Sequence, residues 1–229
     1  MVEIGFDIIG DLHLNPEDSF DWEGKPTSLY CIVAGNVSSD NRTIFQTLSH
    51  LSRFYQGIFY VPGPLEYVSG NDVEKRTNDI LQIASKIPNV AVLHQNVVIV
   101  DGIAILGCNG WEDDNPSFEH LLDTLRLDDI AYLNKSIEKL QKHLDVKKIL
   151  MVSSAVPKKE LYFGLASPKA QERIHLDFAL GSDTEHKVTH WAFGTYEKLV
   201  DTHINGIHYV NNPYVRKMPY WAKRIGINV

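Results

Sequence analysis

Residues 6–14, with the sequence FDIIGDLHL, decide how the rest of this chain can be interpreted. An apolar run before Gly10 predicts a buried strand that ends at this glycine. Asp11 and His13 follow at once, and if the stretch stays extended, residues two positions apart point to the same side. A carboxylate and an imidazole at the carboxyl end of a strand are typical of a metal or phosphate site in an α/β protein.

The composition indicates an ordered, acidic protein. Its 229 residues are 44% hydrophobic and 10% aromatic, so we expect a single globular domain over residues 1–229. The formal net charge of −7 repels polyanions, so nucleic acid is a secondary expectation. The two cysteines lie in apolar, strand-like runs, which favours buried thiols and a reducing compartment. We find neither a signal peptide nor a membrane-spanning run, and we therefore expect a cytoplasmic protein with no membrane partner.

Five apolar, strand-like runs each end in a short polar turn. The turns contain, in chain order, Asp11, Asn36, Pro64, Ser154 and Thr195. Since helical patterns separate several of these runs, the order predicts a mixed α/β sandwich. Its active face is expected where the five turns meet.

Helices are predicted where apolar residues recur at helical spacing. The first begins after residue 40, with Asp40 or a neighbouring serine as its cap, and the second covers residues 72–86. A third covers residues 118–144 and is expected to break near Asp128 and Asp129. Residues 168–180 form the fourth and least distinct helical pattern.

Two residue pairs predict β-hairpins. Asp101-Gly102 and Asn205-Gly206 each separate two strand-like runs, and both central residues of a type I′ turn need positive φ. The second hairpin would place His203 beside His208 on one face. Such a pair could bind a metal, although a solvated outer face is the more common outcome.

The order of the turns resembles that of the calcineurin-like metallophosphoesterases. The blocks of that family, D-x-H, G-D, G-N-H-E, a His-bearing turn before proline, and G-H-x-H, correspond in order to segments across essentially the whole chain. These segments read GDLHL, VAGN, VPGPLEY, MVSSAVP and FGTYE. The resemblance implies an α/β class fold of metallophosphoesterase type, a four-layer sandwich of two mixed sheets flanked by helices.

The resemblance also implies a two-metal site, but this chain departs from the ligand pattern in every block after the first. Asp11 and His13 match the family. Asn36 replaces the bridging aspartate, and an amide lacks the charge that holds two dications together. Pro64 replaces the asparagine ligand, and Leu65 replaces the histidine that acts as an acid.

The histidine positions of the last two blocks have also changed. Ser154 stands at the fourth-block histidine, while Thr195 and Glu197 stand at the two histidines of the fifth block. Asp11, His13 and Glu197 could still hold one Mg²⁺ or Mn²⁺ through waters. Because most ligands are missing, we expect that the chain holds no cofactor.

These departures favour a catalytically degenerate phosphoesterase fold that serves as a binding or scaffolding module for a protein partner. The first alternative is an active phosphohydrolase or nuclease with a single-metal site. The second is a nucleotide- or phosphate-sensing module with a neutral cleft. The polar turn residues that would line this cleft are Asn36, Ser38, Ser39, Ser153, Ser154 and Thr195. The more ordinary interpretation of these polar side chains is that they cap helices and complete turns.

Large aromatic side chains are the candidates for a partner surface, because aromatic residues anchor protein interfaces. We expect this surface to be formed by Trp22, Trp111, Tyr162, Phe163, Tyr214, Tyr220 and Trp221. The last of these residues belong to a basic, aromatic tail over residues 212–229. That tail could contact nucleic acid, but covering a core edge is the more common role of its aromatic residues.

Overall fold

The computed structural model describes residues 2–68, 72–111, 119–162, 186–215 and 218–229. Within these ranges the first sheet is built from β1 (Glu3–Gly10), β2 (Tyr30–Ala34), β3 (Gly57–Val61), β4 (Val90–Val92) and β11 (Lys223–Asn228). The second sheet is built from β5 (Asn96–Val100), β6 (Ile103–Cys108), β7 (Lys148–Ser153), β8 (Val188–Phe193), β9 (Asp201–Ile204) and β10 (Ile207–Val210). The helices are α1 (Asn41–Leu51), α2 (Pro64–Tyr67), α3 (Val73–Ala84), α4 (Glu119–Lys142) and the 3₁₀ turn η2 (Lys159–Leu161).

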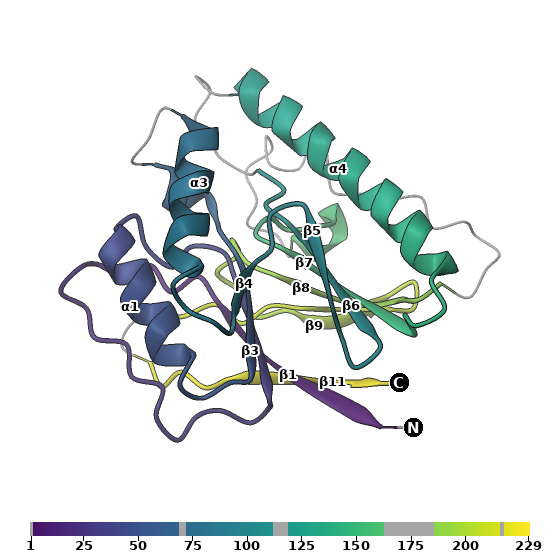
Figure 1. Ribbon diagram of the computed structural model, residues 1–229, viewed down its shortest axis with the longest axis horizontal. Coiled ribbons are helices and arrows are strands. Elements are labelled where there is room, and N and C mark those ends of the chain that lie inside the picture. The colour runs from purple at the N-terminus through teal and green to yellow at the C-terminus, as the bar shows by residue number, and fades with distance from the viewer. Residues whose placement is uncertain (1, 69–71, 112–118, 163–185, 216–217) are drawn as a thin grey trace.

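Both sheets are mixed. The first has the order β11-β1-β2-β3-β4, with β11 antiparallel to β1 and the other pairs parallel. The second has the order β5-β6-β7-β8-β10-β9, with antiparallel pairs at its two ends. Because β1 and β11 pair, the two ends of the chain lie side by side (Figure 1).

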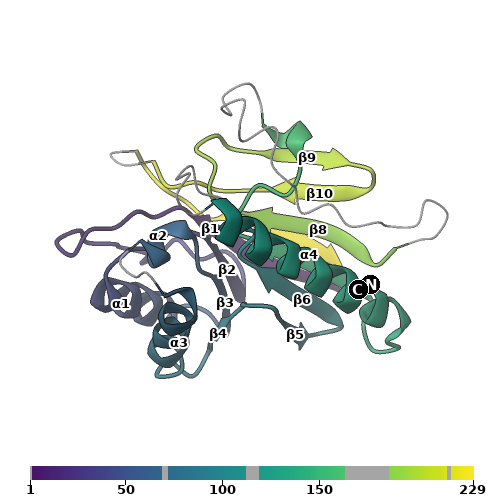
Figure 2. The same cartoon turned by 90° about the horizontal axis from the view of Figure 1, so that it is seen from above.

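Three apolar layers hold the sheets and helices together. Buried side chains from the facing sides of both sheets, such as Ile8, Ile32 and Leu150, form the central layer. The outer side of the first sheet packs against α1 and α3, and that of the second packs against α4 (Figures 1 and 2). The predicted α/β sandwich of two mixed sheets flanked by helices is confirmed.

Local predictions agree with much of this fold. Asp40 caps α1 by accepting a hydrogen bond from the backbone N–H of Thr43. Both predicted hairpins form, and φ is +49° at Asp101 and +80° at Gly102, as a type I′ turn requires. The predicted helix over residues 168–180 lies outside the described residues.

Two features differ from the sequence-based expectation. Helix α4 does not break near Asp128 and Asp129. Asp129 is instead buried and accepts hydrogen bonds from the N–H of Gly110 and the Nε2 of Gln95, both 2.8 Å away, so it connects an unbroken helix to two loops. The tail also contains a strand, β11, which the sequence analysis did not predict, because its side chains read as a basic, aromatic segment.

Candidate functional site

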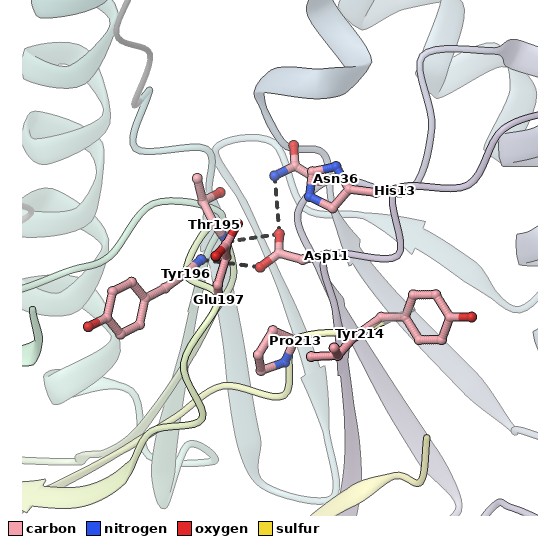
Figure 3. A pocket seen from close by; sticks show the side chains of 9 residues that line it. Asp11, His13, Asn36, Thr195, Tyr196, Glu197, Pro213 and Tyr214 are labelled. Carbon is pink, nitrogen blue, oxygen red and sulfur yellow. Dashed lines mark hydrogen bonds between the residues drawn. The ribbon is translucent and has the colours of Figure 1, made fainter. Parts of the chain in front are cut away.

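The predicted turns after β1, β2 and β8 meet at a pocket of about 570 Å³, here called the Asp11 pocket (Figure 3). Segment 213–215, which follows β10, completes its wall. The lining residues are Asp11, His13, Asn36, Thr195, Tyr196, Glu197, Pro213, Tyr214 and Val215. Five of the eight predicted site positions therefore line one pocket, while Pro64, Leu65 and Ser154 are absent from its wall.

The segment that follows β1 is not extended, which corrects the first expectation. Strand β1 ends at Gly10, and φ is +50° at Asp11 and +46° at His13. The backbone N–H of His13 donates to the carbonyl oxygen of Asn36 at 2.9 Å, which turns the segment toward the loop after β2. Asp11 and His13 nevertheless line the same pocket, because this loop holds the segment there.

The Asp11 carboxylate connects loops from both sheets. Its Oδ1 accepts hydrogen bonds from the backbone N–H of Thr195 at 2.9 Å and from Nδ2 of Asn36 at 3.1 Å. Its Oδ2 accepts from the backbone N–H of Tyr196 at 3.2 Å, as Figure 3 shows. Asp11 is only 5% exposed, and burial is the main cause that raises its pKa to about 6, against the lowering effect of these donors.

The Asn36 amide has an orientation that its neighbours determine. Its Oδ1 accepts from the backbone N–H of Leu65 at 2.9 Å, and its Nδ2 donates to Asp11. Because an N–H group can only donate, the amide oxygen must face Leu65 and the amide nitrogen must face Asp11. The Oδ1 of Asn36, its one side-chain atom that could ligate a metal, is therefore turned toward α2. In that helix Leu65 contributes a backbone N–H to Asn36, and Pro64 is the first residue.

Ser154 and Thr195 complete the junction by contacting each other. Their hydroxyl oxygens lie 2.9 Å apart, and Ser154 is fully buried. Two glycines allow this close approach. A Cβ on Gly35, whose φ is +75°, would lie 2.9 Å from the Ser154 Oγ, and a Cβ on Gly194 would lie 2.4 Å from the backbone oxygen of Ala34.

Glu66 supports the site, although the sequence analysis gave it no role. It is fully buried, and its carboxylate accepts hydrogen bonds from the Tyr60 hydroxyl at 2.9 Å and from the N–H of Gly63 at 2.8 Å. It also accepts from the backbone N–H groups of Val37 and Ser38, next to Asn36. The signal for this role was available, because Glu66 is the one charged residue in the turn VPGPLEY.

The donor set does not fit the two-ion centre that the resemblance implies. Asn36 presents an N–H group to Asp11, and neither Pro64 nor Leu65 offers a side-chain ligand atom. Among the residues that the structure describes, no three His, Cys, Asp or Glu side chains are grouped so that they could hold a metal ion. Asp11, His13 and Glu197 share the pocket, and their binding of one ion through waters stays a prediction.

Three of the seven aromatic residues that were expected to form a partner surface, Trp22, Trp111 and Tyr220, are buried, which corrects the expectation for these three. Trp22 is fully buried and donates from Nε1 to the Tyr55 hydroxyl at 2.7 Å. Tyr220 packs against Trp22 with ring centroids 5.7 Å apart, and Trp111 packs edge-on against Tyr67 at 4.9 Å. Their large apolar areas complete the core beside the first sheet.

The other members of that set keep some exposed surface. Trp221 is 62% exposed, whereas Tyr162 and Tyr214 are half-buried. Phe163 lies outside the described residues. Two cations of the tail pair with acidic side chains, since Lys223 contacts Asp201 and Arg224 contacts Glu3.

The predicted pairing of His203 with His208 is confirmed, and a third histidine joins it. The rings of His203 and His208 stack with centroids 4.4 Å apart, and His190 on the next strand lies 5.3 Å from His208. The Nε2 of His208 lies 2.6 Å from an Asp201 oxygen. Burial first, and then the neighbouring histidines and Lys148, lower the pKa of His190 to about 4.

Comparisons with solved structures support the fold. The chain superimposes on the phosphopantetheinyl hydrolase PptH of Mycobacterium tuberculosis with a TM-score of 0.67 and 15% identity, covering 97% of this chain and 96% of that one. A candidate 5′-nucleotidase of Staphylococcus aureus aligns with a TM-score of 0.54 and 12% identity, over 99% of this chain and 51% of that one. At these identities the likeness shows a phosphoesterase-like fold and not a shared activity.

Comparison with known sequences gives less information about this chain than comparison with solved structures. No protein-family model matches the chain. An uncharacterized protein of Acanthamoeba polyphaga mimivirus, L509, is 25% identical over an alignment of 125 residues, and the match covers 48% of this chain. The match covers 45% of L509, so this chain spans about half the length of that relative. The described residues include no helix long and apolar enough to cross a membrane.

Proposed function

We propose that this chain is a non-catalytic binding or scaffolding module built on a phosphoesterase-like fold. The observation that carries the proposal is the direct hydrogen bond from Asn36 to Asp11, 3.1 Å long. In a two-metal hydrolase, cations neutralise the carboxylates and activate a water molecule. Here the Asn36 amide and two backbone N–H groups donate hydrogen bonds to the buried carboxylate.

The position that the resemblance assigns to an acid, Leu65, and one position that it assigns to a ligand, Ser154, support the same conclusion. Leu65 cannot carry a proton, and its backbone N–H is engaged with Asn36. Ser154 is buried behind Thr195, where the two hydroxyl groups contact each other. A general acid must lie within hydrogen-bond reach of the leaving group, and the Leu65 side chain has no proton to give.

The surface beside the Asp11 pocket suits a protein partner. Val215, which lines the pocket, is 47% exposed, and Leu199, two residues after Glu197, is 62% exposed. The carbonyl of Trp221, whose side chain is 62% exposed, accepts a hydrogen bond from Asn212 next to the pocket wall. Exposed apolar side chains around a pocket are typical of an interaction surface.

The test is a joint metal and activity measurement on the purified chain. Mn, Zn and Fe per chain are determined, and hydrolysis of bis(p-nitrophenyl) phosphate is followed with added Mn²⁺. We expect rates no higher than those of the Asp11→Ala variant, and no rise in melting temperature with metal, because a ligand that binds the native state must stabilise it. Stoichiometric metal with turnover that Asp11→Ala abolishes would refute the proposal and favour the single-metal enzyme.

A further inference from the structure

The Asp11 pocket is lined by two carboxylates and, among its described lining residues, by one basic group, the imidazole of His13. Two of its lining residues, Asp11 and Glu197, carry carboxylates, and none of the described lining residues is a lysine or arginine. Glu197 is exposed at the mouth, whereas Asp11 lies at the base and is 5% exposed. An anionic ligand would meet both carboxylates, so the charge favours a cation.

Asp11 also has acceptor capacity left. A carboxylate offers about four lone-pair sites, and three described donors use three of them. Among the donors in the described part of the chain, two reach Oδ1 and one, the N–H of Tyr196, reaches Oδ2. A buried acceptor gains most from a donor that is itself charged, since such hydrogen bonds are the strong ones.

We propose that the Asp11 pocket binds the guanidinium group of an arginine side chain from a partner protein, with Asp11 and Glu197 as its acceptors. This inference rests on the proposed binding function and names the chemistry of its ligand. A guanidinium offers five N–H donors in a plane and is more weakly hydrated than an ammonium group. A guanidinium group needs hydrogen-bond acceptors at the base and mouth of a pocket, whereas a metal ion needs several ligand atoms that converge on one point.

The pocket wall fits the rest of an arginine side chain. Pro213 and Val215 form part of the wall, and apolar surface suits the three-carbon stem that arginine carries below its charged head. Val215 in the pocket wall and Leu199, two residues after Glu197, offer exposed apolar surface to the remainder of the partner. Arginine is enriched among the residues that anchor protein interfaces.

The experiment uses L-argininamide as the probe and L-citrullinamide as the neutral control of nearly equal shape. Each is titrated into the full chain while NMR follows the backbone N–H signals of Thr195 and Tyr196, which donate to Asp11. We expect argininamide to shift both signals saturably, with a dissociation constant of about 1 mM or weaker for so small a ligand. Citrullinamide is expected to shift neither signal.

Variants separate the two acceptors. Glu197→Gln, on the exposed turn, is expected to weaken argininamide binding about threefold, and Asp11→Asn about tenfold or more. Glu160→Gln, an exposed site in η2, is the matched control and should leave binding unchanged. Glu197→Gln keeps the test decisive if Asp11→Asn fails to fold.

Equal shifts from both amides, or unchanged binding in Glu197→Gln, would overturn the inference. So would Mn²⁺ that binds in the pocket at micromolar concentration and displaces argininamide. These results would not refute the proposed function. Metal-dependent hydrolysis that Asp11→Ala abolishes is the result that would refute it. A chain that neither hydrolyses the phosphodiester nor binds argininamide keeps the proposed function and loses this inference.

Discussion

Glu66 gives the sharpest test of how the loops around the Asp11 pocket are held. Its carboxyl is fully buried, and burial is the largest cause that raises its pKa from 4.5 to about 7, although the donors from Val37, Tyr60 and Gly63 act in the opposite direction. A raised pKa means that the folded protein binds this proton more tightly than the unfolded chain does. The stability that this group contributes is therefore complete below pH 4.5 and is lost as the pH rises through 7.

The expected size follows from that shift. One pKa unit corresponds to 1.36 kcal/mol, so a rise from 4.5 to about 7 corresponds to about 3 kcal/mol. Glu66→Gln removes the titration and turns an amide N–H₂ toward the N–H of Gly63, which costs about 1–3 kcal/mol at every pH. The wild type should therefore be more stable than the variant at pH 4.5, and its advantage should shrink by about 3 kcal/mol by pH 8.

The assay is urea unfolding of both proteins at half-unit intervals from pH 4.5 to 8, followed by tryptophan fluorescence. The quantity of interest is the difference in the free energy of unfolding between them. Glu17→Gln, at an exposed glutamate, is the matched control for replacing a carboxylate with an amide on the surface. A Glu66→Gln difference that stays constant within 1 kcal/mol, or that grows with pH, would refute the reasoning.

Two further predictions concern the junction between the two sheets, and a third concerns the histidines of β8, β9 and β10. Asn36→Asp would place a second carboxylate beside that of Asp11. We expect urea unfolding to show that the free energy of unfolding falls by about 2–3 kcal/mol at pH 8 and by less at pH 5, where Asp11 is protonated. Equal decreases at the two pH values would contradict the charge argument. Gly194→Ala would bring a Cβ to 2.4 Å from the backbone oxygen of Ala34. Because this distance is a steric clash, we expect the melting temperature to fall by several degrees. An unchanged melting temperature would show that the two loops can move apart. The pKa of His190 is lowered to about 4, so the unfolded chain binds a proton on this residue more readily than the folded protein does. The free energy of unfolding of the wild type should therefore fall between pH 6.5 and pH 4, and that of His190→Asn should fall less in the same urea assay. Parallel pH profiles of the two proteins would refute this.

Features that depend on neighbouring residues in the chain were predictable from the sequence. The two hairpins follow from Asp101-Gly102 and Asn205-Gly206, because few other residue pairs tolerate positive φ at both positions. The cap at Asp40 follows from the short reach of its side chain to an N–H three residues on. Five polar turns at strand ends predicted the α/β sandwich, and the described turns after β1, β2 and β8 meet at one pocket.

Features that depend on residues distant in the sequence were not predictable in the same way. Trp22 and Tyr220 read as exposed anchors, because only the folded chain brings them together at the first sheet. Strand β11 forms because β1 has a free edge for it to pair with, and the sequence of the tail carries no sign of that edge.

The sequence by itself therefore determined the fold class and the residue types at Asn36, Pro64 and Leu65, since both depend on residue identity and order. Only the tertiary structure decided how these residues are arranged around Asp11. It turned the Asn36 amide toward Asp11 and used the backbone of Leu65 to hold it there. The physical reason is that hydrogen bonds and burial depend on the positions of atoms from distant segments, which become fixed only when the two sheets pack together.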